Sequence, residues 1–332
     1  MTYKGIVATT KVDAHKMRIA KEDLEEMAHA INEDECVPSF SIEHDLTVLP
    51  IGKVYKAWVD SFDDEDYALH AEQEIFENIS FITRNGEKYI VLKSDIDDRP
   101  FASDIFSNNE RLIIGTDFIN FESHEKSKEF LEILKSEFDI DIQPISRKSA
   151  IPDPQLVFQL VESSVVYLLI YLCSKQVVER VGDALVDTAL TEAKNLYALI
   201  KKTIKTGSKY ILPKNRPVTY VYRGSNDYVI ELIVRTTNPD IAISAISEEK
   251  LKEAMDKIDS IKGLFSKIRK VQLVYNELDS KWEFNYLTTE TGEVIGTEQS
   301  YEKTIKLKEK YLGNSENINV SIGMSAQLDD TP

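Results

Sequence analysis

Two neighbouring residues, His44 and Asp45, give this chain its clearest side chains for acid–base chemistry. They end a short apolar stretch over residues 40–44, and a new strand is expected to begin at Ile51-Gly52-Lys53 after a short loop. A histidine at a strand edge can act as a general base because its pKa lies near neutral pH. Such a base requires a nucleophile, which a hydroxyl group elsewhere in the chain must supply.

Three hydroxyl side chains are candidates for that nucleophile: Thr116, Ser107 and Ser80. None lies in a recognisable catalytic motif. The alternative is that His44 and Asp45 form a structural or surface pair. A metal site is not expected, because three adjacent residues of one strand, 43–45, cannot all point to one ion. The two cysteines lie far apart and lack metal-ligand spacing, and no cofactor motif is present.

The composition is that of a folded protein without a nucleic-acid partner. The chain has 332 residues, 42% of them hydrophobic, and its net charge of −17 disfavours a phosphate backbone. Residues 1–150 hold 32 acidic and 17 basic side chains, whereas residues 151–332 hold 25 and 23. This asymmetry predicts two units with different surfaces. Few cysteines and the absence of an export signal predict a cytoplasmic location.

The first unit reads as several short strands with one early helix. Apolar residues at helical spacing predict a helix over residues 21–32, and alternation predicts a strand over 67–75. Asn85-Gly86 predicts a hairpin turn between strands 79–84 and 87–92. Another strand is expected over residues 111–121. This pattern favours a small mixed β-barrel with helices.

The order of these elements over residues 3–122 resembles the serine proteases that mature the proheads of tailed phages. The most specific part is His44-Asp45 with Ile51-Gly52-Lys53 about seven residues later. The resemblance implies the fold shared with herpesvirus capsid-maturation proteases, with His44 as the catalytic histidine that activates a serine.

The nucleophile of that family is not matched. Its serine lies in a Ser-x-Gly-Phe element, and aligning Gly115 with that glycine puts Ile113 where the serine belongs. Thr116 would face the opposite side of a strand from Ile113. The resemblance therefore implies a protease-like barrel that has lost its nucleophile, in which Asp45, Ile113 and Gly115 would line a binding site.

Residues 155–172 form the most apolar segment. The uncharged run over 163–174 is shorter than the roughly 20 residues of a transmembrane helix. We therefore expect a buried or oligomer-forming helix. An interfacial membrane helix and a helix exposed only on activation remain alternatives. The residues expected at its membrane or oligomer face are Val165, Leu168, Leu169 and Leu172.

The expected organisation is α+β. It comprises a barrel over 1–125, an amphipathic helix and linker over 126–154, and an apolar helical segment over 155–206. A small antiparallel α+β unit over 207–324 and a disordered tail over 325–332 follow.

Three functions stay open. The first is a non-catalytic interaction or effector protein with a protein partner, in a phage or anti-phage context and with self-association as an option. The second is a serine or threonine endopeptidase that uses His44. The third is an effector at the inner surface of the membrane.

Overall fold

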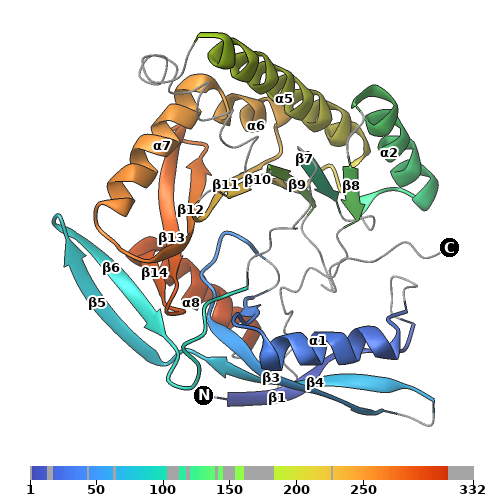
Figure 1. The fold of residues 1–332 in the computed structure, drawn as a ribbon, viewed down its shortest axis with the longest axis vertical. Helices are drawn as coiled ribbons and strands as arrows, with labels where there is room; N and C mark the ends of the chain where they lie inside the picture. Colours follow the sequence, from blue (N-terminus) through green and yellow to red (C-terminus); the bar gives the residue numbers. More distant parts are fainter. Residues whose placement is uncertain are drawn as a thin grey trace.

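The computed structural model describes residues 2–12, 18–42, 45–62, 65–102, 112–116, 120–138, 141–144, 154–160, 183–225 and 227–312. Their strands form two sheets (Figure 1). One has four strands in the order β1-β4-β3-β2, and the other has ten in the order β5-β6-β14-β13-β12-β11-β10-β9-β7-β8.

The four-stranded sheet is antiparallel and carries one helix. Its strands are β1 (Thr2–Thr9), β4 (Tyr67–Ile75), β3 (Gly52–Ser61) and β2 (Ser39–Phe40). Helix α1 (Lys21–Glu33) buries Leu24, Ala28 and Ile31 against it. These residues repeat at helical spacing, so one face of α1 is apolar and must be covered. The helix and its packed face are confirmed as predicted.

The ten-stranded sheet is mixed, largely antiparallel and curled. Its first strands are β5 (Asn78–Arg84), β6 (Glu87–Lys93), β14 (Val294–Thr297), β13 (Lys281–Thr289) and β12 (Ile268–Asn276). The remaining strands are β11 (Val229–Thr236), β10 (Val218–Ser225), β9 (Gln155–Leu160), β7 (Leu112–Thr116) and β8 (Asp141–Pro144). The pairs β9–β10, β11–β12 and β7–β8 are parallel.

Helices cover the outer face of this curl (Figure 1). They are α2 (His124–Phe138), α5 (Asp183–Tyr210), α6 (Pro239–Ala245) and α7 (Glu248–Lys262). The face that points away from them, here called the inner face, is turned toward the four-stranded sheet and α1. Helix α8 (Glu298–Leu312) follows β14 directly and lies on the inner side.

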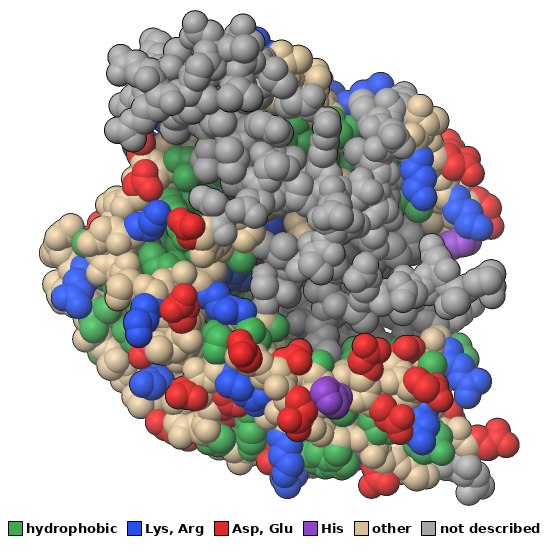
Figure 2. Space-filling model, viewed as in Figure 1, with side chains coloured by type: hydrophobic (Ala, Val, Ile, Leu, Met, Phe, Trp, Pro, Cys, Tyr) green, Lys and Arg blue, Asp and Glu red, His purple; other side chains and the backbone are tan. Residues whose placement is uncertain are grey.

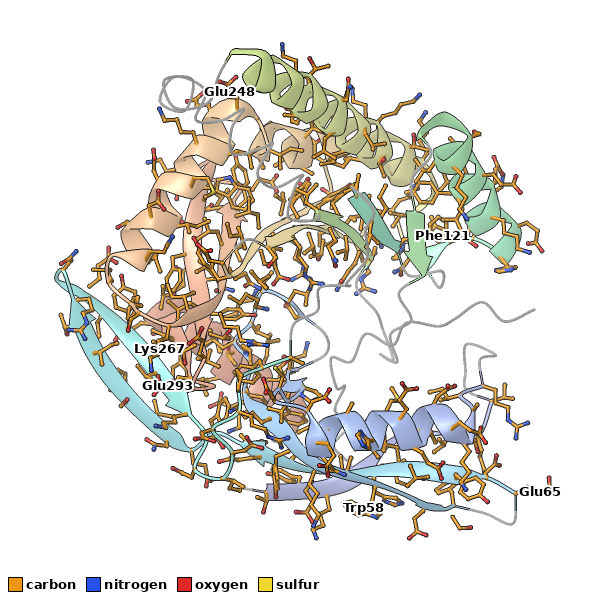
Figure 3. The ribbon with its side chains drawn as sticks, in the orientation of Figure 1. Trp58, Glu65, Phe121, Glu248, Lys267 and Glu293 are labelled. Carbon is orange, nitrogen blue, oxygen red and sulfur yellow. The ribbon has the colours of Figure 1, made fainter. Side chains whose placement is uncertain are left out.

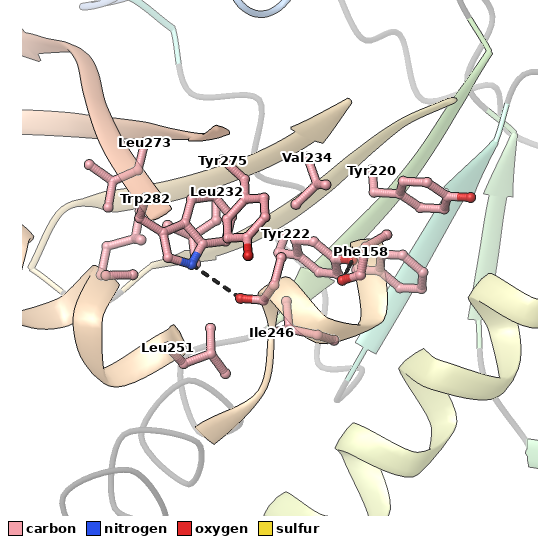
Figure 4. Packing of buried hydrophobic residues seen from close by; sticks show 14 of the residues in the cluster. Phe158, Tyr220, Tyr222, Leu232, Val234, Ile246, Leu251, Leu273, Tyr275 and Trp282 are labelled. Atoms are coloured by element: carbon pink, nitrogen blue, oxygen red, sulfur yellow. Dashed lines mark hydrogen bonds between the residues drawn. The ribbon is translucent and has the colours of Figure 1, made fainter. Parts of the chain in front are cut away.

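The largest core lies between the outer face and its helices (Figure 4). Trp282 is buried there, and its indole nitrogen donates to the carbonyl of Ala245 at 3.1 Å. The hydroxyl of Tyr222 donates to the carbonyl of Ala242 at 3.0 Å. Both carbonyls belong to α6, so two aromatic residues satisfy backbone groups that burial would otherwise leave unpaired.

The α+β class is confirmed, but the expected barrel strands are divided between the two sheets. The hairpin β5–β6 forms as predicted, with positive φ angles of 49° and 82° at Asn85 and Gly86. It joins the larger sheet, because β6 pairs with β14. Likewise β7 pairs with β9 across the expected linker. Strand β6 is buried on both faces from Tyr89 to Leu92, so it needs neighbours that local pattern alone does not specify.

The prediction that an apolar helix begins at residue 155 is wrong, since Gln155–Leu160 is strand β9. All six of its residues are buried, and a short run buried on both faces has no period that separates strand from helix. Residues 161–182 lie outside the described residues, and with them Val165, Leu168, Leu169 and Leu172. None of the described helices is long and apolar enough to cross a membrane.

Candidate functional site

The inner face of the ten-stranded sheet carries a row of buried polar side chains. Gln159, Arg223, Glu231 and Gln272 are cross-strand partners from β9 to β12. Directly paired residues share a face, so their side chains all point inward. The next inward row is apolar and consists of Val157, Val221, Ile233 and Val274. We call Arg223, Glu231, Lys270, Gln272 and Asn285 the inner-face cluster.

Glu231 is the centre of this cluster and is fully buried. Arg223 donates through Nε to Glu231 Oε2. The second oxygen, Oε1, accepts from Gln272 Nε2 at 2.6 Å and lies 3.4 Å from Lys270 Nζ. A buried carboxylate is stable only when its charge and lone pairs are both satisfied, and here both are.

These contacts determine the protonation state of Glu231. Burial by itself would raise the pKa of the carboxyl group. The charges of Arg223 and Lys270, together with the hydrogen bonds from Gln272 and Arg223, outweigh burial and lower the pKa to about 2. Glu231 is therefore ionised throughout the physiological range.

Asp45 forms a second charged group at the edge of the same face. Its Oδ1 accepts from the backbone nitrogen of Thr47 at 2.8 Å and from the Thr47 hydroxyl at 2.5 Å. Its Oδ2 lies 3.5 Å from Arg235 Nη1 on β11 and 3.8 Å from Lys303 Nζ on α8. Lys303 also donates to the Thr47 hydroxyl. Asp45 thus joins its own loop to a strand and a helix that are far away in sequence.

The loop after Asp45 is held directly on the inner-face cluster. Gln272 Nε2 donates to the carbonyl of Leu46 at 2.9 Å, and Asn285 Nδ2 donates to the carbonyl of Thr47 at 3.1 Å. The backbone nitrogen of Leu49 donates to Thr304 Oγ1 at 3.0 Å. Side chains therefore satisfy the backbone of a loop that has no strand partner here. The arrangement fixes the loop that follows His44 in sequence.

Thr116 is not brought to this site. It pairs with Leu156, whose side chain packs in the helix-covered core. Arg235, which contacts Asp45, is in register with Thr219 and Gln155. Gln155 directly precedes Leu156 on β9, so the side chains in register with Gln155 lie on the other face of the sheet. Thr116 and Asp45 therefore lie on opposite faces. The Thr116 hydroxyl is buried and has no hydrogen-bond partner among the described residues.

The other predicted site residues are dispersed or undescribed. Ile113 and Gly115 pair with Gln159 and Val157, so they lie on the same face as the cluster; their predicted role in binding stays a prediction. Ser80 is exposed on β5 at the far end of the sheet. His44 and Ser107 lie outside the described residues.

Gly52 and Lys53, which carry part of the resemblance to prohead proteases, have structural roles here. A Cβ on Gly52 would overlap the carbonyl oxygen of Glu74 on the neighbouring strand. Lys53 is buried, and its Nζ donates to the carbonyls of Asp97 at 2.7 Å and Arg99 at 2.5 Å. Burial lowers the pKa of Lys53 to about 8 despite the nearby carboxylate of Asp97.

The described histidines are His29, His70 and His124. His70 stacks on Trp58 with ring centroids 5.5 Å apart, and Trp58 lies on the side of its sheet away from α1 (Figure 3). The described residues contain no group of histidine, cysteine and acidic side chains that could hold a metal ion. Figure 2 shows basic and acidic side chains interspersed over the coloured part of the surface, rather than gathered by sign.

Sequence reasoning missed the inner-face cluster. Its signal was present, since Arg223 and Glu231 are charged residues within largely apolar stretches on either side of the polar residues 224–227. In a hairpin, residues equally far from the turn face each other, so the pair is predictable once the turn is placed. Gln272 and Asn285 carry no comparable signal, because the loop carbonyls that they bind, those of Leu46 and Thr47, lie more than 200 residues away.

Comparison with known proteins finds no matching family model, and no curated protein or solved structure matches significantly. The resemblance to the prohead proteases thus rests on the order of elements over residues 3–122 and on His44-Asp45 with Ile51-Gly52-Lys53.

Proposed function

We propose that this chain is a non-catalytic interaction protein. The observation that carries the proposal is the separation of Thr116 from Asp45 by the thickness of the larger sheet. A hydroxyl nucleophile must come within hydrogen-bond reach of its base, about 2.6–3.2 Å. Because Thr116 lies on the other face, a base next to Asp45 in sequence would have to cross the sheet to reach its hydroxyl.

The chemistry of the buried carboxylates supports the same proposal. A general base works best when its pKa lies near the working pH. Glu231, with a pKa of about 2, is a weak base at neutral pH, and its oxygens already accept hydrogen bonds. Asp45 is likewise engaged with Arg235 and Thr47. The carboxylates of Glu231 and Asp45 therefore have structural roles, because their oxygens bind other parts of the chain.

The proposed partner is a protein, and a phage structural or assembly protein is the first to test. This partner class rests on the resemblance to the prohead proteases, which is an argument from fold and motif alone. Phage plaque counts with and without the gene, over a broad phage panel, test it. A reduction in plaques for particular phages is expected. Unchanged counts across the panel would remove the phage context.

The non-catalytic part is tested by intact mass after treatment with a fluorophosphonate that reacts with activated serine and threonine hydroxyls. We expect no adduct on the folded protein. Thr116→Val, which removes the buried hydroxyl and nearly keeps the shape of the side chain, should likewise show no change in mass after this treatment. A stoichiometric adduct that disappears in His44→Ala would overturn the proposal, and peptide mapping would identify the nucleophile.

A further inference from the structure

Strand β5 ends the ten-stranded sheet, and its outer edge has no partner among the described residues. Six of its seven residues are exposed, including the apolar Ile79 and Phe81 at 38% and 56%. In Figure 1 the strand lies at the outer margin of the molecule, with no labelled element beyond it. An exposed edge strand presents unpaired backbone groups that can accept another strand.

The turn identifies which backbone groups face that open edge. In a two-residue hairpin, the flanking residues Arg84 and Glu87 form a hydrogen-bonded pair, so the backbone groups of Arg84 point toward β6. Because the direction of the backbone groups alternates along a strand, the amides and carbonyls of Thr83, Phe81 and Ile79 point toward the open edge of β5. These residues also share one face of the strand, so the open backbone and the exposed apolar side chains belong to the same positions.

The other three sheet edges carry the features that usually prevent strand addition. Strand β1 has an exposed lysine, Lys4, and an irregularity between Ile6 and Ala8. Strand β2 has only two residues, and β8 is short and ends in Pro144. By contrast, residues 78–83 of β5 read Asn-Ile-Ser-Phe-Ile-Thr, without charge or proline. An edge of this kind is expected to be covered.

Charges at the two ends of β5 indicate what covers it. The turn end carries the basic residues Arg84 and Lys88 with one acidic residue, Glu87, so its net charge is +1. The opposite end carries the exposed acidic residues Glu77 and Asp95 with one lysine, Lys93, so its net charge is −1. A second β5 in antiparallel orientation brings the basic end of each copy beside the acidic end of the other. A parallel copy would place like charges together. The strand is therefore self-complementary in one orientation only.

We propose that two copies of this chain associate by pairing their β5 strands antiparallel around a two-fold axis at Phe81. This register places Phe81 opposite Phe81 of the second copy and Ile79 opposite Thr83. The three residues of each copy whose backbone groups face the open edge then all form hydrogen-bonded pairs. The two ten-stranded sheets become one continuous sheet. The interface is isologous, as expected of a symmetric dimer.

The first test is the mass of the full chain in solution, measured by sedimentation over a range of concentrations. The parent chain should approach twice the monomer mass as concentration rises. Phe81→Lys should weaken association by at least about tenfold, because a lysine at an edge disfavours strand addition. The matched control is Leu278→Lys in the β12–β13 turn, where the leucine is 95% exposed. It should associate as the parent does.

A charge exchange tests the orientation. Arg84→Glu and Glu77→Arg should each weaken self-association, because each variant gives the two adjoining strand ends net charges of the same sign. Mixing the two variants should restore association, since both ends of the mixed pair are then complementary. Restored association supports the two-fold antiparallel register. Mixtures no tighter than the separate variants would overturn it.

Hydrogen exchange provides a readout that does not depend on mutation. Amides of Ile79, Phe81 and Thr83 should gain protection as concentration rises, whereas the edge amides of β1 should not. A parent chain that stays monomeric throughout, or a Phe81→Lys variant that dimerises as tightly as the parent, overturns the proposal. Either result leaves the non-catalytic function standing, because the fluorophosphonate experiment tests that separately.

Discussion

Arg223 and Glu231 face each other across the β10–β11 hairpin as a buried ion pair, with 4% and 0% of their surfaces exposed. They are register partners equally far from the turn. A shift of the hairpin by one residue would move one of the two charges to the apolar outer face without its partner. The pair therefore specifies the register of the strands at the centre of the larger sheet.

Removing one charge of this pair should destabilise the protein strongly. Glu231→Gln removes the buried carboxylate charge that Arg223 and Lys270 contact, and we expect a loss of about 3–5 kcal/mol in the free energy of unfolding. Denaturant unfolding followed by circular dichroism measures it. The control is Glu298→Gln, which breaks an exposed ion pair with Lys88 and should cost under about 1 kcal/mol. Equal losses in the two variants would refute this role of Glu231.

The same carboxylate predicts an acid-dependent stability. Its pKa in the folded protein is about 2, below the ordinary value of 4.5, so the unfolded state binds protons first as pH falls. The stabilisation by Glu231 is complete above about pH 4.5 and is lost progressively toward pH 2. Unfolding free energies of the parent and Glu231→Gln, measured across this window, should converge at low pH. If the two free energies of unfolding stay equally far apart down to pH 2, the low pKa of Glu231 is contradicted.

Lys53 predicts a second rise in stability with pH, in the alkaline range. Burial lowers its pKa to about 8 in the folded protein, below 10.5 in the unfolded chain. The folded state loses this proton first, so the lysine contributes stability that increases as pH rises from about 8 to 10.5. Lys53→Met should lack this component. It should also cost about 1–3 kcal/mol at neutral pH, because the carbonyls of Asp97 and Arg99 lose their donor. Subtracting the two pH profiles isolates the effect.

Gly52 should not tolerate a side chain. A Cβ there would overlap the backbone carbonyl of Glu74, which cannot move without separating β3 from β4. We expect Gly52→Ala to cost about 3 kcal/mol or more in thermal or denaturant unfolding. Gly5→Ala on β1 is the matched control, since nothing lies within 4 Å of its added Cβ. A harmless Gly52→Ala would show that the two strands adjust easily.

Local signals in the sequence predicted the elements that depend on local contacts. The helix predicted from the apolar spacing of α1 and the turn predicted at Asn85-Gly86 both appear as expected. Strand β9 was mistaken for helix because burial on both faces removes its period.

The candidate site was less predictable than the fold class. Asp45 was a candidate binding residue, but its contacts with Arg235 and Lys303 were not predicted, since these residues follow it by 190 or more positions. Such pairings depend on sheet order, which local pattern does not encode. The orientation of Thr116 away from Ile113 followed from strand alternation and is what the structure shows.

The pairing of β6 with β14 has a consequence for the synthesis of the chain. Residues 89–92 pair with β5 on one edge and with residues 294–297 on the other, so the hairpin emerges from the ribosome about 200 residues before its second partner. At ordinary elongation rates of about 5–20 residues per second, it waits about 10 seconds or longer. During that interval both edges of an apolar hairpin are open, which makes the nascent chain a substrate for chaperones and predicts slow, late completion of the larger sheet.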